Sequence, residues 1–426
     1  MPVTFPPRQA HGMLTETPPP PVVLVVATEW FSAHGGLSTL NRRLCIALAA
    51  RSTVLCLVPA SSEAEREHAA GHRVRLVTAR PLPGGTAEQA LIRRPALPAN
   101  VRPDVVIGHG RVTGGAAKVQ AEDHFPGARR LQVVHVAPDE LEWWRADRAD
   151  DAGVRADDRT RIELELAADA YRTIAVGPRL DQLLWRDLSV FPGAIKPVRM
   201  DPGFDSAPTR ARKPPPGSPV QILLMGRIED HAIKGVDLAA RALGSALPLC
   251  DPRAEVELLV RGAPPGESSA LREWIMRLAG GTGLRVTPRP FTTDAGHLKQ
   301  DLLRASLVLM PSRAESFGLV GAEAVAAGTP VLVSDRSGLG SLLTEVLPRE
   351  ATTRIVLPVG SRGDEDITRW GHRIAAVLND REAAFRNARA VQRTLARRRT
   401  WTAAANRVLD AVLPGHFGPS TKPAPR

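Results

Sequence analysis

Cysteines and aromatic residues are scarce in this chain of 426 residues, and both scarcities limit what the protein can be. The three cysteines, Cys45, Cys56 and Cys250, are too few and too widely spaced for a disulfide framework or a zinc site, so we expect buried thiols in a reducing cytoplasm. Aromatic residues make up 4% of the chain, whereas nucleic-acid sites interleave basic residues with exposed aromatic rings. We therefore predict no nucleic-acid partner, although 56 basic and 45 acidic residues leave a net charge of +11.

Long apolar runs are missing as well. No segment approaches the roughly 20 consecutive apolar residues that a membrane-spanning helix needs. Residues 1–21 lack a basic segment followed by an apolar stretch and end in four prolines, so we predict a disordered arm rather than a secretory signal. We also predict a disordered tail at 415–426. These features favour a cytoplasmic protein, and the basic excess leaves open a peripheral contact with an anionic membrane.

Several nucleotide and metal motifs are absent. The chain has no G-x-x-x-x-G-K-[ST] loop and no H-E-x-x-H pair, which argues against a P-loop enzyme and a zinc protease. The near match GTGLRV at Gly281 lacks the third glycine and precedes a strand, which argues against dinucleotide binding. The acidic run Asp364, Glu365 and Asp366 precedes a helix and is typical of capping, so we predict no metal site.

Strand-like and helix-like segments alternate along the sequence in two series, as a chain too long for one ordinary core would require. The first series predicts strands at 22–27, 53–58, 74–77, 105–108, 131–136 and 173–176. The second predicts strands at 221–225, 255–260, 285–287, 307–310, 330–333 and 354–357. Helices are predicted at 37–50, 236–247, 270–278, 298–305, 319–327, 367–378 and 401–413.

The fold class that follows is α/β, with two Rossmann-like, doubly wound domains that face each other across a cleft. Continuous apolar runs such as VVLVVA at the first strand are typical of parallel strands covered on both faces. We place the domains at 22–203 and 220–398, the proline-rich linker at 204–219 and a closing helix at 399–414.

The segment MPSRAESFGLVGAEAVAAGTPVLV at 310–333 is the richest in candidate site residues. A strand ends at Pro311, a polar loop holds Glu315, and Ser316 is the expected N-cap of a helix that begins near Gly318 and contains Glu323. Amides at such a helix start bind phosphate, and the candidates are Ser316, Phe317, Gly318, Leu319 and Val320. Glu323 would hold a ribose diol, and Glu315 would lie beside a sugar. The alternative is that both carboxylates only favour the positive helix end, but the strand–loop–helix context favours a site.

Two basic residues flank another predicted turn at the same edge of the second sheet. Gly226 and Arg227 follow a strand directly, and Lys234 and Gly235 open the next helix. An arginine that binds two oxygens and a lysine that acts as a point charge can clamp a diphosphate, although a solvated charge pair is the simpler alternative.

The first half offers weaker candidates. Gly35 and Gly36 lie between the first strand and the first helix, where the backbone can approach a phosphate. His135 follows the apolar run LQVV and is expected to face the cleft, and His109 has the same position after VVIG. Lone histidines are usually structural, so a catalytic role for either stays open.

These motifs resemble family-4 retaining glycosyltransferases of the GT-B fold. The resemblance rests on ESFGLVGAE followed by A-x-G-T-P-V, on the Arg227 and Lys234 turn, on the Gly35–Gly36 loop and on DPGFD at 201–205, and it covers nearly the whole chain. It implies that Arg227 and Lys234 bind the donor diphosphate, that Glu323 holds the ribose and that Glu315 contacts the donor sugar. The Gly318–Val320 amides would bind phosphate and His135 would lie near the sugar, while Trp401 would open a helix that crosses back to the first domain.

The function implied is transfer of a hexose or hexosamine, with retention, from a UDP- or GDP-sugar to an acceptor hydroxyl by metal-independent front-face substitution. No resident cofactor is expected, because the nucleotide sugar is a co-substrate, with UDP favoured over GDP. The acceptor alcohol is a small molecule, a glycan or a lipid-linked molecule, and the sequence does not fix the oligomeric state. The alternatives are a GT-B-fold epimerase, a phosphorylase carrying a pyridoxal-phosphate lysine, or a non-catalytic module that binds sugar nucleotides.

Overall fold

The structure is a computed structural model that describes residues 19–31, 36–144, 151–205, 212–253, 255–281, 283–360 and 363–414. The predicted arm up to residue 18, the predicted tail at 415–426 and the central part of the predicted linker lie outside these residues. No helix within the described part of the chain combines the length and the apolar composition that crossing a bilayer requires.

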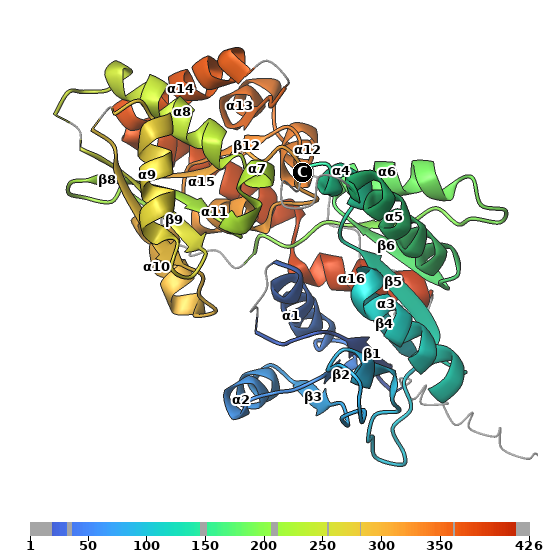
Figure 1. Ribbon diagram of the computed structural model, residues 1–426. Helices are drawn as coiled ribbons and strands as arrows, with labels where there is room; N and C mark the ends of the chain where they lie inside the picture. The colour runs from blue at the N-terminus through green and yellow to red at the C-terminus, as the bar shows by residue number, and fades with distance from the viewer. Residues whose placement is uncertain are drawn as a thin grey trace, which may run out of the picture.

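The first half of the chain forms a parallel sheet of seven strands in the order β3-β2-β1-β4-β5-β6-β7 (Figure 1). Its strands are β1 (Val22–Val26), β2 (Thr53–Val58), β3 (Val74–Thr78), β4 (Val105–His109), β5 (Arg129–Val134), β6 (Arg172–Val176) and β7 (Val198–Met200). Helices between them are α1 (Gly36–Leu48), α2 (Glu63–Gly71), α3 (Gly110–Val119), α4 (Pro138–Glu142), α5 (Ala152–Ala168) and α6 (Pro178–Leu188). The inner strands β1, β2, β4, β5 and β6 are almost wholly buried because helices cover both faces of the sheet, whereas the edge strands β3 and β7 are partly exposed.

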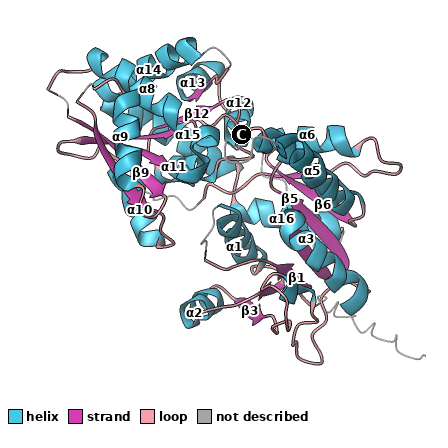
Figure 2. Cartoon of the chain, viewed as in Figure 1, coloured by secondary structure: helices cyan, strands magenta, loops and turns pink. Residues whose placement is uncertain are grey.

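The second half forms a parallel sheet of six strands in the order β10-β9-β8-β11-β12-β13. Figure 2 shows the strands in magenta and the helices that surround them in cyan. Its strands are β8 (Val220–Met225), β9 (Val256–Ala263), β10 (Arg285–Pro290), β11 (Leu307–Met310), β12 (Val331–Ser334) and β13 (Val356–Leu357). Helices are α7 (His231–Lys234), α8 (Val236–Ala246), α9 (Ser268–Leu278), α10 (Ala295–Arg304), α11 (Leu319–Ala327), α12 (Gly338–Val346), α13 (Arg349–Ile355), α14 (Gly363–Asn379) and α15 (Arg381–Arg398). In both sheets the first strand lies between the second strand and the fourth, so the strand order reverses beside it, as in a doubly wound fold.

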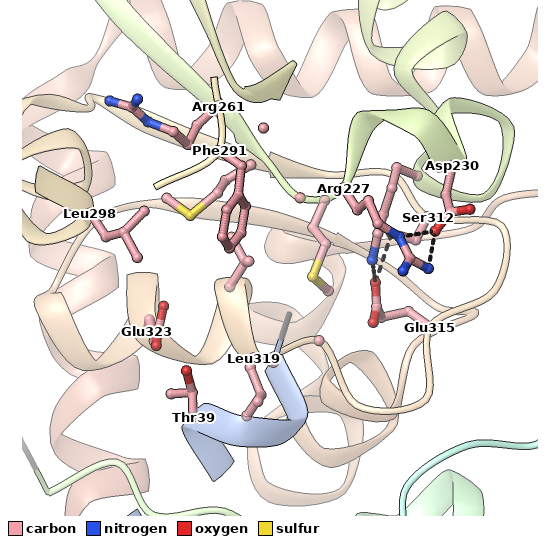
Figure 3. Close-up of a pocket in the computed structure, with 18 of the residues that line it drawn as sticks. Thr39, Arg227, Asp230, Arg261, Phe291, Leu298, Ser312, Glu315, Leu319 and Glu323 are labelled. Atoms are coloured by element: carbon pink, nitrogen blue, oxygen red, sulfur yellow. Dashed lines mark hydrogen bonds and ion pairs between the residues drawn. The ribbon is translucent and has the colours of Figure 1, made fainter. Parts of the chain in front are cut away.

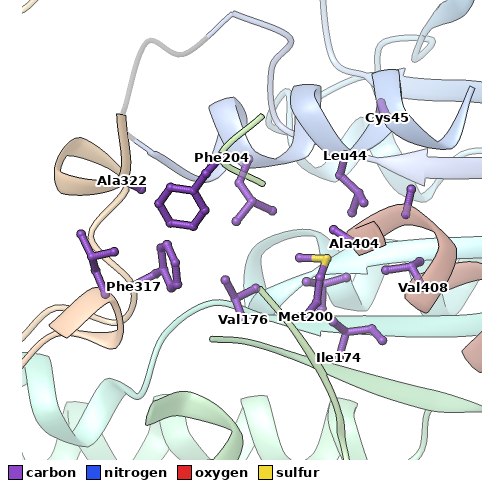
Figure 4. Packing of buried hydrophobic residues seen from close by; sticks show 14 of the residues in the cluster. Leu44, Cys45, Ile174, Val176, Met200, Phe204, Phe317, Ala322, Ala404 and Val408 are labelled. Carbon is purple, nitrogen blue, oxygen red and sulfur yellow. The ribbon is translucent and has the colours of Figure 1, made fainter. Parts of the chain in front are cut away.

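The last helix, α16 (Trp401–Val412), returns to the first sheet, as expected. It packs against α1 and β7, and its Ala404 and Val408 lie beside Leu44 and Met200 in one buried cluster (Figure 4). The fold class predicted from the sequence, including this crossing, is confirmed.

The chain passes between the two halves twice at one place. The backbone amide of Phe204 donates to the carbonyl of Arg399 at 2.9 Å, and the amide of Trp401 donates to Asp205 at 3.0 Å. Buried Asp201 accepts hydrogen bonds from Arg399, at 2.7 Å, and from Arg199. The outgoing and returning segments are therefore tied to each other. The exact domain boundaries at 203 and 220 stay a prediction.

Two expectations about strands were wrong. β7 is missing from the predicted strands because its three residues, between Pro197 and Pro202, are too few to form a pattern. The strand expected at 354–357 is shorter, since Arg354 and Ile355 end helix α13 and only Val356 and Leu357 pair with β12.

Candidate active site

A cleft of about 1280 Å³ lies where the C-terminal ends of both sheets face each other. The first half contributes α1, Val176 at the end of β6 and His135 just after β5. The second half contributes the loops that follow β8, β9, β10 and β11. Ligands of open α/β sheets bind at this edge, so the cleft is the natural place for a substrate.

Glu315 and Lys234 form an ion pair on the floor of this cleft. The Lys234 Nζ atom lies 2.6 Å from Glu315 Oε2, and Ser312 donates a longer hydrogen bond of 3.4 Å to the same oxygen (Figure 3). Both side chains are about one-fifth exposed, so the pair is reachable from the cleft. The sequence predicted only that both residues lie at the same edge of the second sheet. The structure places their side chains in direct contact.

Gly235 explains why Lys234 reaches this position. Lys234 ends the one-turn helix α7 instead of opening α8, as the sequence suggested, and Gly235 joins the two helices with a φ of +66°. A Cβ atom at Gly235 would lie 2.1 Å from the carbonyl oxygen of Pro311, so only glycine lets the turn pack on the end of β11.

Arg227 lies on the same wall and is half exposed. Its guanidinium donates to Asp230 at 2.8 Å, and no other carboxylate within the described residues pairs with it (Figure 3). An exposed ion pair of this kind contributes little stability, so the arginine can exchange Asp230 for an anionic ligand at low energetic cost.

The start of α11 differs from the prediction. Gly318, with a φ of +98°, is the N-cap, and Ser316 makes no capping hydrogen bond. Ser316 cannot be the N-cap, because the helix begins at Leu319 and the residue directly before it is Gly318. In the described part of the chain, the amides of Gly318, Leu319 and Val320 donate to no protein acceptor, and all three residues line the cleft.

The loop before α11 also contacts the first half. The Phe317 side chain is buried and packs on Gly177, where a Cβ atom would lie 2.7 Å from the ring (Figure 4). Leu319 packs in the same way against Gly36, the first residue of α1. Phe317 therefore contributes its backbone to the cleft while its side chain joins the core. Gly35 lies outside the described residues.

Glu323 faces α1 across the cleft and lies beside Thr39 (Figure 3). Burial raises the pKa of Glu323, and the positive charges of Arg43 and Arg42 on α1 partly offset that rise. Arg42 donates to the carbonyl of Trp30 at 3.0 Å. Neither arginine stands out in the sequence, because basic residues on an amphipathic helix are usually solvated.

The two candidate histidines lie together. The Nδ1 atom of His109 is 2.8 Å from Nε2 of His135, and of the two residues only His135 lines the cleft. Burial lowers the pKa of His109 to about 4, while burial and the neighbouring His109 hold the pKa of His135 well below its usual value. His109 ends β4 and His135 directly follows β5, and the expected adjacency of these two parallel strands is the signal that could have paired the histidines.

One family of known proteins matches nearly the whole of this arrangement. The family described as "Family 4 Glycosyltransferase in conflict systems" matches residues 24–408, from the first strand of the first sheet into α16. The chain belongs to family 4 of the glycosyltransferases. Its resemblance to that family, drawn from the sequence motifs, is thus confirmed.

Curated relatives of this family-4 chain carry the name D-inositol 3-phosphate glycosyltransferase. The one from Nocardia farcinica is 31% identical over 229 residues, which are 52% of this chain and 48% of the relative. The one from Stackebrandtia nassauensis is 29% identical over 343 residues, which are 75% of this chain and 71% of the relative. The chain spans about half the length of the Nocardia relative.

Solved structures share the fold at low identity. Sucrose-phosphate synthase from Thermosynechococcus elongatus superposes with a TM-score of 0.64 at 19% identity, covering 91% of this chain and 97% of that one. Anabaena HepE, solved in complex with UDP-glucose, gives a TM-score of 0.63 at 16% identity and covers 92% and 99%. The two-sheet arrangement of the family-4 chain is therefore the GT-B fold.

Metal-binding side chains do not gather in the described part of this family-4 chain, where no group of three His, Cys, Asp or Glu residues could hold an ion. The acidic run at the start of α14 has a structural role instead. Asp366 accepts the amide of Gly360 at 2.7 Å and pairs with Arg369, which fixes the first turn of the helix.

Proposed function

We propose that this protein is a retaining glycosyltransferase that moves a hexose or hexosamine from a nucleotide sugar to an acceptor hydroxyl. The observation that carries the proposal is the Lys234–Glu315 contact in the cleft, beside the amides of Gly318, Leu319 and Val320, which donate to no acceptor among the described residues. A cation next to free amides suits a diphosphate, and a carboxylate beside them suits sugar hydroxyls.

The donor fits the cleft in one orientation. Its diphosphate lies at the start of α11, where Lys234 and Arg227 neutralise its charge. Glu323, farther along the helix, accepts hydrogen bonds from the ribose hydroxyls. Glu315 then contacts hydroxyls of the transferred sugar, and His135 approaches that sugar from the first half.

The chemistry follows from the charges that surround the diphosphate. The bond between the anomeric carbon and the phosphate oxygen breaks while the acceptor oxygen bonds to the same face of that carbon. The acceptor proton passes to the departing phosphate, whose negative charge Arg227 and Lys234 stabilise. The scheme needs no protein base and no metal ion, so we expect the rate to be unchanged by a chelator.

UDP is the favoured nucleotide, because the HepE neighbour was solved with UDP-glucose. The relatives' name suggests an acceptor that is a phosphorylated polyol, and Arg42 and Arg43 on the first-half wall suit an anionic group. A glycan or a lipid-linked alcohol at a membrane surface is the alternative acceptor. The three cysteines are free and buried, which suits a reducing cytoplasm.

Thermal shifts with UDP, GDP, ADP and their sugar conjugates test the donor site. A ligand that binds only the folded protein raises the melting temperature according to RT ln(1 + [L]/Kd). We expect a selective shift with UDP and UDP-sugars that Glu323→Ala abolishes, because the ribose contact is lost. Product analysis by NMR should then show the donor's anomeric configuration retained. No shift with any nucleotide would contradict the proposal.

A further inference from the structure

Two imidazoles form a buried pair behind the cleft wall of the first half. His109 ends β4 and His135 follows β5, and these strands are parallel neighbours. The rings lie with their centroids 5.1 Å apart and tilted by 36°, and Nδ1 of His109 is 2.8 Å from Nε2 of His135. His109 is wholly buried, while His135 is 9% exposed and lines the cleft.

The four ring nitrogens of the pair have different surroundings. One nitrogen of each ring forms the shared hydrogen bond. His109 Nε2 is buried and has no partner among the described residues. His135 Nδ1 has no hydrogen-bond partner among the described residues either. Unlike His109 Nε2 it is not fully buried, so it is the nitrogen through which His135 faces the cleft.

The unpaired Nε2 atom of His109 decides which ring donates. If His135 donated through Nε2–H, His109 would have to carry its proton on Nε2, where a buried N–H would have no acceptor. An unsatisfied buried donor is rarer and less tolerated than an unsatisfied buried acceptor. His109 therefore donates through Nδ1–H, and a neutral His135, whose Nε2 accepts, must carry its own proton on Nδ1.

We propose that His109 is a positioning residue that fixes His135 as a neutral hydrogen-bond donor, with Nδ1–H directed into the cleft toward a substrate oxygen. His135 then cannot take a proton from the acceptor alcohol, because the nitrogen that faces the substrate already carries one. Burial, which lowers the pKa of both histidines, is consistent with a neutral pair. The identity of the substrate oxygen rests on the proposed function, whereas the tautomer does not.

The tautomer can be measured on the full-length protein without substrate. Histidine-selective ¹⁵N labelling and correlations between ring nitrogens and ring protons identify which nitrogen carries the proton, and His135→Gln assigns the signal. We expect His135 to be the Nδ1–H tautomer at neutral pH, and the Nε2–H tautomer or a charged ring would overturn the proposal. If no nucleotide sugar is turned over, the proposed function fails while this spectrum still decides the tautomer.

Two variants of His109 separate positioning from packing. His109→Asn keeps a donor, because its amide nitrogen is one bond beyond Cγ, as Nδ1 is, whereas His109→Leu fills similar volume without a donor. In the His109→Leu variant we expect His135 to lose its Nδ1–H tautomer. We also expect kcat to fall about tenfold, while the affinity for UDP stays within about twofold of the wild-type value. His109→Asn should restore the tautomer and most of the rate. A His109→Leu protein that folds and turns over like the wild type would overturn the proposal.

Discussion

Lys234 and Glu315 neutralise each other in the cleft, so a ligand that binds either residue must break their ion pair. Their contact of 2.6 Å lies in a partly buried place, where an ion pair is screened less than at the surface. If a donor binds as proposed, its diphosphate replaces Glu315 as the partner of Lys234, and its sugar replaces Lys234 as the partner of Glu315. Losing either residue leaves the other charge uncompensated in the free protein.

Lys234→Ala should lower kcat/KM by roughly 10- to 100-fold, because a hydrogen bond to a charged group contributes about 1.5–3 kcal/mol. Steady-state kinetics with a UDP-sugar would measure the loss. Lys118→Ala is the matched control, since Lys118 lies on α3 and pairs with Asp169 on the surface. Equal kinetics for both variants would rule out a diphosphate contact for Lys234.

Glu163 on α5 is a second residue with a measurable signature. It is 6% exposed, and its carboxylate accepts the amide of Arg111 at 2.7 Å, at the start of α3. Burial raises the pKa of Glu163 to about 7 from an ordinary value of 4.5, although the Arg111 amide partly opposes the shift. Between these two values the folded protein binds more protons at this site than the unfolded chain does.

The free energy of unfolding should therefore fall as pH rises from about 4.5 to about 7, by about 3 kcal/mol from this residue. Glu163→Gln keeps an acceptor for Arg111 and should remove this part of the slope, as measured by urea unfolding at several pH values. Glu165→Gln on the exposed side of the same helix should keep the wild-type slope. Identical slopes for Glu163→Gln and the wild type would contradict the assignment.

Single residues were predictable from sequence where a motif carried them. Glu315, Glu323, Arg227 and Lys234 all line the cleft, because they lie in the segments that follow β8 and β11 at one edge of the sheet. Arg42 and Arg43 were not predictable, since their place depends on how α1 faces α11 across two halves of the chain. The catalytic and binding roles of all these residues stay predictions.

Among the elements, the link between α7 and α8 depends most on one backbone conformation. Gly235 has a positive φ and lies against Pro311 at the end of β11, so the link positions the lysine before it. Gly266, before α9, also has a positive φ, of +80°, but a Cβ atom there would meet nothing within 4 Å.

Gly235→Ala should lower the free energy of unfolding by more than about 2 kcal/mol. The strain of the positive φ adds to the clash of the new Cβ atom, which would lie 2.1 Å from the carbonyl oxygen of Pro311. Gly266→Ala carries the same backbone strain in open space and should cost only about 1 kcal/mol. Chemical denaturation measures both. The contact would be unimportant if the two variants lost equal stability.

Apolar elements between clear turn residues were predicted well, whereas the long but polar helices α5 and α15 were not predicted. The strand at β11 and the helix α11 have the predicted bounds, because turn residues on both sides delimit an apolar run. β7 and the one-turn helix α7 were missed, since their three or four residues form neither an apolar run nor a periodic pattern. Tertiary contacts, such as the pairing of β7 with β6, determine those segments instead.

For the whole molecule, α16 joins the last residues of the chain to the core of the first half. Val408, Leu409 and Val412 are almost fully buried in the cluster that contains α1 and β7. The Asp201–Arg399 ion pair, at 2.7 Å, joins the segment before α16 to the segment that follows β7. The first half is therefore incomplete without the end of the chain.

A chain that ends at Arg398 should lose stability in its first half and not in its second. Removing α16 uncovers apolar surface on α1 and β7, and each large buried side chain contributes about 1.5–3 kcal/mol. Hydrogen exchange should show loss of protection in β1 and β7 with β8 and β11 little changed. A chain that ends at Pro414 keeps α16 and serves as the control. Uniform loss of protection across both sheets would contradict this view.

The position of α16 also has a consequence during synthesis on the ribosome. Domains of most proteins fold in the order in which they are made, the N-terminal one first. Here the α1 face of the first sheet stays uncovered until Trp401–Val412 has been translated, after the whole second sheet. The nascent first half therefore keeps apolar surface on α1 and β7 exposed while the second half is translated, although all seven strands of its own sheet have already been made.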